Sequence, residues 1–480
     1  MTPSKQQEAI YADIAMGEGH TVVVARAGCG KTTTIVESLA KVPSHVRNDV
    51  LLVAFNKSIA AALQDRAPRG VEVSTLHSYG LRQISQAVHP RPQIDADKMR
   101  KILRGLSKSA EMRVVVAKIT SLAKGMLVSS ETGLDALIDS NGIALPGLGE
   151  LTESDERRVR SKAIALSLEA LRLSREDQTT IDFDDMIWFP NIFDVRCTKY
   201  ARIFVDETQD LNAAQVKLAL KACELGGRIC AVGDPAQAIY GFRGADSMAI
   251  KKLTAKLNAK TLPLSITYRC ARAIVALARE YVPDFEAAPD APTGSVTETT
   301  DAIMLRDVAP GDFILSRTNA PLVTYAFALY RQGRPAHIQG RDLSTHLKAI
   351  IARAKTENVA DFLAKTETWR AKEVKRLLDL DRDTSMTEDT AECLVALAED
   401  CTSVSEIGEK VDTLFADLTG DGHDRIVLSS THKAKGLERD RVWLLRDTFM
   451  RRPGDEEKNL FYVAVTRAKN DLRLVRTTKA

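Results

Sequence analysis

The chain has 480 residues, of which 44% are hydrophobic and 27% are charged, and its formal net charge is +3. This length predicts two to four domains, and the composition is that of a folded protein rather than a disordered or repetitive one. The sequence contains no apolar run of about 18 residues, no secretory leader and no C-x-x-C pair, so we expect neither a membrane-spanning helix nor a disulfide frame or zinc site. We therefore expect the cytoplasm, or the nucleoid, as the location of this protein.

The first chemically informative element is a buried strand over Thr21 to Ala25, followed by a small-residue loop and a helix that begins at Lys31. Helix N-termini present unpaired N–H groups to anions, and glycines let the backbone approach a phosphate closely. The stretch ARAGCGKTT therefore predicts a phosphate loop in which Lys31 neutralises charge and Thr32 ligates Mg²⁺. The strict pattern G-x-x-x-x-G-K-[ST] fails at Ala25, so a glycine-rich turn remains the alternative. The residues assigned to nucleotide binding here are Ala25, Arg26, Ala27, Gly28, Cys29, Gly30, Lys31, Thr32 and Thr33.

A second buried strand is predicted over Ile203 to Val205, within ARIFVDETQD. It places Asp206 and Glu207 at the carboxyl end of a strand, where open α/β sheets bind ligands. Asp206 is assigned to hold Mg²⁺, and Glu207 to orient or deprotonate the attacking water. Two acids after a strand also occur as a solvated cap, which is the alternative.

Further motifs follow in a fixed order. They read TPSKQQEAI, ARAGCGKT, LLVAFNKS, TLHSYG, IDFDDM, VDETQD, AVGDPAQAIYGFRGAD, LSITYRC, SSTHKAKGLERDRVWLL and FYVAVTRAKNDLRLV. This series resembles the UvrD/Rep/PcrA family of superfamily 1 (SF1A) DNA helicases, in a compact form, from residue 2 to about residue 475. The phosphate loop of that family is A-x-x-G-x-G-K-T, which accounts for Ala25.

The resemblance implies ATP and Mg²⁺ as cofactors and a role for each matching residue. Gln6 would read the adenine edge, Tyr268 would stack on the adenine, and Glu438 would lie near the ribose. Gln237 would sense the γ-phosphate, and Arg269 and Arg467 would act as arginine fingers. Guanidinium groups from a second domain would stabilise the transition state only when the domains close, which links hydrolysis to motion. The implied catalytic set is Lys31, Glu207, Gln237, Arg269 and Arg467, with Thr32 and Asp206 at the metal.

Single-stranded nucleic acid is held by aromatic platforms and a positive groove. Phe242 stands where the family usually has tryptophan, and VAFNKS is one residue shorter than the usual form, which puts the register of Asn56 in doubt. Core packing of the aromatics and a structural role for His77 are the alternatives. The residues that the resemblance assigns to DNA are Phe55, Asn56, Thr75, His77, Phe183, Tyr240, Phe242, Thr431, His432 and Lys435.

The expected fold class is α/β, with two RecA-like parallel-sheet P-loop NTPase cores, each interrupted by a mainly helical insertion. Lysines and arginines of the first insertion would either contact phosphate or form a solvated helix face. The second insertion is smaller than usual in the family, so we expect simpler control, or control by a partner. The expected boundaries are residues 1–88 and 178–258 for the first core, 89–177 for its insertion, 259–340 and 425–480 for the second core, and 341–424 for its insertion.

The resemblance implies an ATP-dependent DNA helicase or translocase that moves 3′ to 5′ on single strands and single-strand/duplex junctions, in DNA repair or replication. UvrD-like helicases generally continue beyond the last strand into a hairpin that helps to split duplex, whereas this chain ends at Ala480, which leaves translocation better supported than unwinding. The alternatives are a single-strand-stimulated ATPase that strips proteins with little unwinding, and an ATP-gated assembly or binding protein. The chain would be a monomer or weak oligomer, with a loading or regulatory protein as a further partner.

Overall fold

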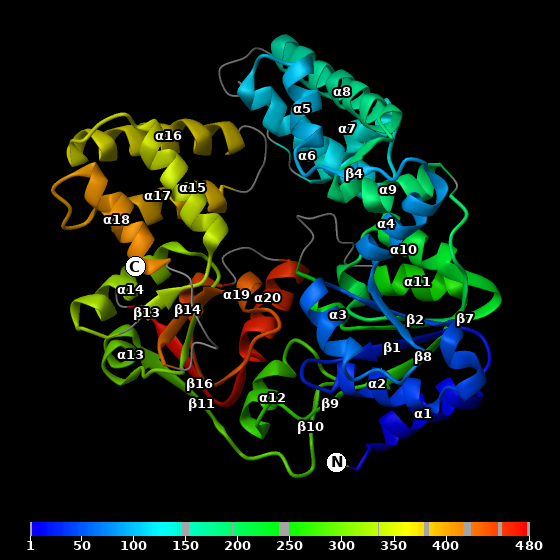
Figure 1. Cartoon of the computed structure of the whole chain (residues 1–480). Helices are drawn as coiled ribbons and strands as arrows, with labels where there is room; N and C mark the ends of the chain where they lie inside the picture. Colours follow the sequence, from blue (N-terminus) through cyan, green and yellow to red (C-terminus); the bar gives the residue numbers. More distant parts are fainter. Residues whose placement is uncertain are drawn as a thin grey trace. The chain divides into compact units, whose positions relative to one another are not determined.

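The structure is a computed structural model of the chain and describes residues 2–141, 143, 145, 153–193, 195–239, 249–334, 336–378, 384–415, 424–449 and 454–477. The chain forms two compact units, Met1–Ser265 and Ile266–Ala480, and each is built on its own parallel sheet (Figure 1). The predicted α/β class with two parallel-sheet cores is confirmed. Across the described residues, no helix is both long and apolar enough to cross a bilayer.

The sheet of the first unit has six parallel strands in the order β3-β2-β6-β7-β1-β8. Because all six point the same way, their carboxyl ends meet at one edge of the sheet, where ligands of open α/β sheets bind. The predicted strand over Thr21 to Ala25 is confirmed in full. The strands are β1 (Thr21–Ala25), β2 (Val50–Ala54), β3 (Glu72–Thr75), β6 (Tyr200–Val205), β7 (Cys223–Gly233) and β8 (Lys260–Leu264).

Because successive side chains of a strand point to opposite faces of the sheet, alternate residues of these strands pack into two separate apolar layers. Val22 packs into one layer and Val23 into the other. Helices α1 (Lys5–Met16), α2 (Lys31–Lys41) and α3 (Lys57–Gln64) cover the face of Val23. The opposite face is covered by α4 (Leu76–Ala87), α9 (Phe183–Ile192), α10 (Ala213–Ala222) and α11 (Ala249–Leu257), and Figure 1 shows α4, α10 and α11 above the sheet with α1 and α2 below it.

Helices also fill the chain between α4 and α9, and two of their lysines are buried. Lys98 and Lys124 are 2% and 1% exposed. The Lys98 ammonium lies 2.8 Å from Asp185, and that of Lys124 lies 2.7 Å from Asp185 and 3.0 Å from Asp182. The prediction of phosphate contacts or a solvated face is therefore wrong for these two lysines, because the aspartates of IDFDDM neutralise them inside the fold. The elements here are β4 (Gln93–Ile94), α5 (Lys98–Leu106), α6 (Ala110–Met126), α7 (Glu131–Ser140), α8 (Glu153–Glu176) and β5 (Thr180–Ile181).

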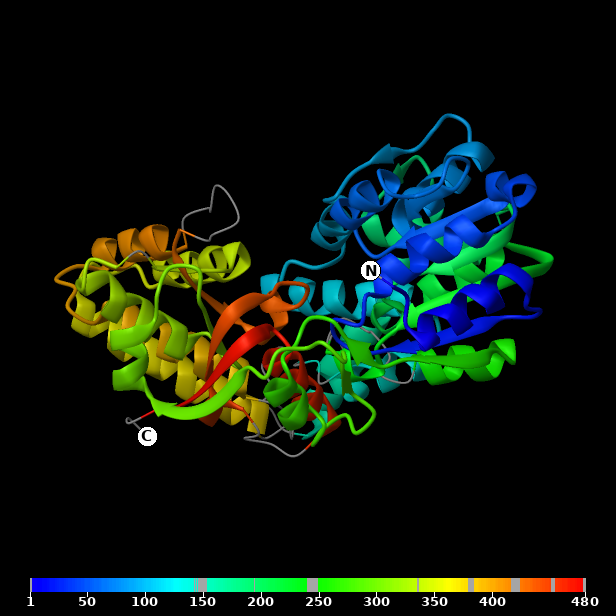
Figure 2. The ribbon, with the colours of Figure 1, turned by 90° about the horizontal axis from the view of Figure 1, so that it is seen from below.

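The second unit has a parallel six-stranded sheet in the order β11-β16-β15-β12-β14-β13. Figure 2 shows β15 in orange and β16 in red side by side. The predicted strands FILSR, RIVLSS, VWLLR and LRLVR all lie in this sheet. The strands are β11 (Ser295–Thr300), β12 (Phe313–Ser316), β13 (Ala336–Ile338), β14 (Ile426–Ser430), β15 (Arg439–Leu445) and β16 (Ala468–Arg476), and a separate short pair is formed by β9 (Ile266–Thr267) and β10 (Glu286–Ala287).

One apolar cluster joins a face of this sheet to a group of helices beyond it. Trp443 and Leu445 of the sheet, Leu322 of α14 and Leu394 of α17 belong to the same cluster. Asp389 of α17 accepts hydrogen bonds from the Asn319 and Ala320 amides, which start α14. The helices of the unit are α12 (Arg272–Ala278), α13 (Asp301–Asp307), α14 (Ala320–Arg331), α15 (Arg341–Arg353), α16 (Val359–Leu378), α17 (Ser385–Ala398), α18 (Val404–Leu414), α19 (Thr431–Ala434) and α20 (Asp455–Val465).

Candidate functional site

The loop between β1 and α2 has the conformation that phosphate binding requires. Gly28 and Gly30 adopt φ values of 67° and 78°, in the left-handed region that favours glycine. Gly30 is the N-cap of α2 and provides no side chain, so the first N–H groups of the helix are left for an external acceptor. The buried side chains of Ala27 and Cys29 anchor the loop against the core. The loop emerges at the carboxyl end of β1, between β7 and β8.

Carboxylates lie at the same edge of the sheet, directly after β6 and β7. Asp206 and Glu207 follow β6, and Asp234 follows β7. The Lys31 ammonium lies 3.0 Å from the Glu207 carboxylate, and the Arg26 guanidinium lies 3.2 Å from that of Asp234. The fold thus brings the loop together with Asp206 and Glu207, the two acids assigned from the sequence, and adds Asp234, which was not assigned.

Burial and charge perturb these groups strongly. Burial and, after it, the neighbouring charge of Glu207 raise the pKa of Asp206 to about 7. Burial also raises the pKa of Asp234. Burial alone would lower the pKa of the Lys31 ammonium, but the surrounding carboxylates, Glu207 foremost, outweigh it and hold that pKa above its ordinary value. Perturbed groups of this kind are typical of functional sites.

Two glutamines extend this polar cluster, and only Gln237 was assigned a role from the sequence. The Gln237 amide donates to the Asp234 carboxylate at 2.7 Å. The Gln209 amide donates to the Glu207 carboxylate at 2.5 Å and accepts the Asp234 backbone N–H at 3.0 Å. Gln209 lies inside the quoted VDETQD motif, but nothing in its spacing shows that it reaches the end of β7.

Gln6 lies at the start of α1 and pairs with the end of β8. Its amide donates to the Ser265 hydroxyl and accepts the Ser265 backbone N–H, both at 2.8 Å. The neighbouring Gln7 donates to Thr34 of α2 at 3.0 Å. Of the two threonines assigned to the nucleotide, Thr32 is half-buried and Thr33 is exposed.

The arginines assigned as fingers lie together in the second unit. Arg269 forms an ion pair with Glu438 and donates to the Thr466 carbonyl at 3.3 Å. Arg467 is 1% exposed and donates to the carbonyls of Val463 and Leu437 at 2.9 and 3.1 Å. Burial and, after it, the charge of Arg269 lower the pKa of Arg467 to about 10. Tyr268, next to Arg269, is half-buried.

Several residues assigned to DNA lie at the carboxyl edge of the first sheet. Phe55 follows β2 and is 37% exposed, and Thr75 ends the adjacent strand, paired with Ala54. Thr75 is buried and caps α4 by accepting the Ser78 N–H at 3.1 Å, and His77 follows in the first turn of that helix. Burial lowers the pKa of His77, and the charge of Lys57 adds to this, so the imidazole is neutral at pH 7.

The other DNA candidates are more varied in their surroundings. Asn56 caps α3 through the Ile59 N–H at 2.9 Å, whereas Phe183 begins α9 and is 52% exposed. In the second unit, Thr431 is buried and donates to the Ser316 carbonyl at 3.2 Å, and His432 and Lys435 are half-buried in and after α19. Tyr240 and Phe242 lie outside the described residues.

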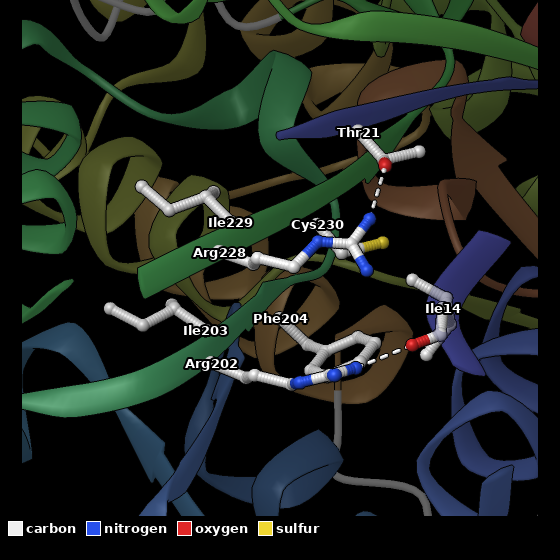
Figure 3. Close-up of a pocket in the computed structure, with 8 residues that line it drawn as sticks. All are labelled: Ile14, Thr21, Arg202, Ile203, Phe204, Arg228, Ile229 and Cys230. Atoms are coloured by element: carbon white, nitrogen blue, oxygen red, sulfur yellow. Dashed lines mark hydrogen bonds between the residues drawn. The ribbon is translucent and has the colours of Figure 1, made fainter. Parts of the chain in front are cut away.

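A small cavity lies beside Thr21 at the start of β1 and beside residues in the middle of β6 and β7 (Figure 3). Its volume is about 10 Å³, which is room for about one water molecule. Arg228 donates to the Thr21 hydroxyl there, and Arg202 donates to the Ile14 carbonyl. This cavity is therefore distinct from the phosphate loop and is too small for a nucleotide.

Comparison with known proteins identifies the family. The family model of the UvrD/REP helicase N-terminal domain matches residues 4–258, and that of the UvrD-like helicase C-terminal domain matches residues 198–479.

Curated relatives include the F-box DNA helicase protein 1 of Schizosaccharomyces pombe, 27% identical over 515 residues, which cover 94% of this chain and 55% of that protein. The ATP-dependent DNA helicase UvrD1 of Mycobacterium bovis is 26% identical over 324 residues, 59% of this chain and 39% of the relative. The ATP-dependent DNA helicase PcrA of Staphylococcus aureus is 25% identical over 311 residues, 58% of this chain and 39% of the relative. The chain thus spans about half or less of the length of these relatives. Since each family description matches more than half of the residues, the chain belongs to the UvrD/REP family of helicases.

Proposed function

We propose that this chain is an ATP-dependent DNA helicase or translocase that moves 3′ to 5′ along single-stranded DNA and hydrolyses ATP between its two RecA-like cores. The main support is the cluster in which the phosphate-loop lysine, Lys31, lies 3.0 Å from the acid Glu207. The names of the similar proteins, which are DNA helicases, support DNA as the substrate. The direction of movement rests on the resemblance to the family.

The donor set fits Mg²⁺ bound together with a nucleotide. Mg²⁺ takes oxygen ligands and is usually held by one or two carboxylates with phosphate oxygens and water. Asp206 is 3% exposed, and burial, together with the charge of Glu207, raises its pKa, so a bound cation would favour its ionised form. Within the described ranges, no group of three or more His, Cys, Asp and Glu side chains is arranged to hold a metal ion. Phosphate oxygens of the nucleotide would have to supply the other ligands. Asp206 and the Thr32 hydroxyl would therefore hold Mg²⁺ with ATP, whose phosphoryl transfer supplies the free energy for movement.

The residues of the first unit would then divide the reaction between them. The loop from Ala25 to Thr33 holds the phosphates, chiefly through the N–H groups that start α2, and Lys31 neutralises their charge. Glu207 accepts a proton from the attacking water or orients it. Gln6 recognises the adenine edge, since an amide can both donate and accept. Gln237 reports the state of the γ-phosphate.

The residues of the second unit would complete catalysis. Arg269 and Arg467 stabilise the negative charge that develops on the transferred phosphoryl group. Arg269 is paired with Glu438 through Nε, and its guanidinium has further N–H groups that could donate to phosphate. Tyr268 stacks on the adenine, and Glu438 lies near the ribose.

DNA would run over aromatic and polar side chains of both units. We assign base stacking to Phe55, Phe183, Tyr240 and Phe242, and backbone or base contacts to Asn56, Thr75, His77, Thr431, His432 and Lys435. Residues 89–177 and 341–424 would form the insertions of the two cores. The activity belongs where the chromosome is, in the cytoplasm and on the nucleoid, in repair or replication.

Hydrolysis and unwinding assays test this proposal. ATPase rate is measured with and without single-stranded DNA, and strand separation is measured on 3′-tailed, 5′-tailed and blunt duplexes. We expect stimulation by DNA and unwinding of the 3′-tailed substrate. Streptavidin displacement without strand separation would instead identify a protein-stripping motor. Hydrolysis that ignores DNA would overturn the motor assignment in favour of an ATP-gated assembly protein.

A further inference from the structure

Gln209 occupies an unusual place in the first unit, since its side chain links two segments that follow different strands. It lies in the short helical turn Thr208–Asp210 after β6, and it is 1% exposed. Its amide nitrogen donates to the Glu207 carboxylate at 2.5 Å, and its amide oxygen accepts the Asp234 N–H at 3.0 Å. The carboxylate can only accept and the N–H can only donate, so the two partners fix the orientation of the amide.

The link continues from Asp234 to Gln237. The Asp234 carboxylate accepts from the Gln237 amide at 2.7 Å and from the Arg26 guanidinium at 3.2 Å. Asp234 is fully buried and Gln237 is 5% exposed, so water competes little for these bonds. Hydrogen bonds therefore connect Glu207 to Gln209, Gln209 to the backbone of Asp234, and the side chain of Asp234 to Gln237.

Packing leaves little freedom for the amide. A Cβ atom placed on Gly233, the last residue of β7, would lie 2.5 Å from the Gln209 amide oxygen and 2.8 Å from the Ile250 side chain. Real Cβ atoms do not approach this closely, so the close approach of Gln209 to the strand depends on glycine at this position. The amide is thus held between the backbone of β7 and the Glu207 carboxylate.

Glu207 needs such a partner for two reasons. Its φ of 49° is left-handed, a conformation that costs energy in a non-glycine residue and persists only where the surroundings fix it. The Glu207 carboxylate also lies 3.0 Å from the Lys31 ammonium. When Lys31 turns to a phosphate, that contact is lost, whereas the bond from Gln209 does not depend on Lys31.

We propose that Gln209 is a positioning residue that keeps the Glu207 carboxylate aimed during hydrolysis and ties its position to Gln237. This inference rests on the proposed function, in which Glu207 activates water and Gln237 senses the γ-phosphate. Gln209 itself touches neither nucleotide nor DNA in this scheme. Through its two hydrogen bonds, Gln209 couples the position of Gln237 to that of the Glu207 carboxylate.

The test replaces Gln209 with methionine, which keeps the length of the side chain but makes no such hydrogen bonds, and with glutamate, which sets a second carboxylate against Glu207. We expect kcat of the DNA-stimulated ATPase to fall about 10- to 100-fold in Gln209→Met and at least as far in Gln209→Glu. KM for ATP should change less than about threefold, because the phosphate loop is intact. Single-strand affinity should also lose its difference between ADP and a non-hydrolysable ATP analogue.

Gln83 provides the matched control. It is 0% exposed in the same unit, and its amide oxygen accepts the Thr198 N–H at 2.7 Å. Gln83→Met therefore removes a buried amide of the same kind on α4, whose hydrogen bond is to Thr198 and not to Glu207 or Gln237. We expect it to lower the Tm without lowering kcat at a temperature where the variant is folded. Equal loss of kcat in both folded variants, or wild-type kcat in Gln209→Met, would overturn the proposal.

A double variant tests whether Gln209 acts through Glu207. Glu207→Gln removes the charge that Gln209 is proposed to aim, so adding Gln209→Met should slow the reaction less than about twofold further. Losses that multiply would contradict the proposal and assign Gln209 an independent role. Failure of the wild-type chain to hydrolyse ATP would instead reject the proposed function, so the two failures are distinguishable.

Discussion

The phosphate-loop region of the first unit and the arginine cluster of the second unit carry opposite excesses of charge. The first region sets two cations among three carboxylates, and the second sets three cations around one carboxylate. The residues are Lys31 and Arg26 with Asp206, Glu207 and Asp234 in the first region, and Arg269, Arg467 and Lys469 with Glu438 in the second.

The pKa values follow this difference. Burial raises the pKa of Asp206 to about 7, with a further contribution from Glu207, since a buried carboxylate short of positive charge resists ionisation. Burial and the charge of Arg269 lower the pKa of Arg467 to about 10, since a buried cation beside a second cation resists protonation. The first region is therefore suited to a metal cation with its phosphates, and the second to additional negative charge.

Removing the loop lysine should break the first region most severely. Lys31→Ala takes a cation from a site that already has an excess of acid, so we expect ATP hydrolysis to fall to background. Phosphate release by the purified variant measures this. Lys41→Ala, at the exposed end of the same helix, is the control and should keep wild-type turnover. Normal hydrolysis by Lys31→Ala would exclude the loop as the phosphate site.

Removing an arginine tests the second region. Arg269→Ala should lower kcat by about 10³-fold, which is the lower range for an arginine finger. Arg269→Lys should recover little, because a single ammonium cannot reproduce the guanidinium fork. The exposed Arg279 of the same unit provides the control. If alanine at 269 and alanine at 279 have the same small effect, the charge excess of this cluster has no catalytic meaning.

The acid of the first region should have a smaller effect when its charge alone is removed. Glu207→Gln keeps the size of the side chain, so we expect Mg–ATP to bind while turnover falls about 100-fold. Binding is measured with a fluorescent nucleotide and turnover by phosphate release. A variant that turns over normally would show that the proton acceptor is another group.

Much of this fold could be predicted because apolar periodicity and glycine spacing are local properties. The strand Thr21–Ala25 and the helix start at Lys31 both follow from the run of β-branched residues and the loop after it. The placement of Asp206 at a strand end follows from the same reasoning. The grouping of Arg269 with Arg467 in one site came from the order of the motifs, because no local sequence pattern predicts that these two residues lie together.

Long-range polar pairing could not be predicted from the sequence. Lys98 and Lys124 read as surface cations, yet they are neutralised by aspartates 58 to 87 residues away. The bonds from Gln209 to the end of β7 span 25 residues and depend on the glycine that ends that strand. Such pairings arise only when the topology brings the segments together, so no periodicity reveals them.

An exposed aromatic residue tests whether DNA contact is separable from both charged regions. Phe183 is 52% exposed at the start of α9, so Phe183→Ala removes a candidate stacking platform without opening the core. A stacked base contributes about 1–3 kcal/mol, so single-strand affinity should fall about 5- to 150-fold while DNA-free hydrolysis persists. Fluorescence anisotropy measures the affinity. Tyr330→Ala, at a residue that is 59% exposed on α14, is the control, and equal effects of the two changes would contradict the assignment.

The smallest expected effect is a change in stability with pH that reports the acid excess directly. With its pKa raised to about 7 in the fold, Asp206 holds a proton at pH values where the unfolded chain has released it. Its stabilising contribution is therefore complete below the unfolded pKa and is lost as pH rises through about 7. In EDTA, Asp206→Asn should gain a few degrees in Tm over the wild-type chain at pH 8 and much less at pH 5. Mg–ATP should reverse the sign at pH 8, because the cation requires the carboxylate that asparagine lacks. The exposed Asp65→Asn change provides the control, and a Tm difference for Asp206→Asn that is constant between pH 5 and pH 8 would show that this carboxylate ionises normally in the fold.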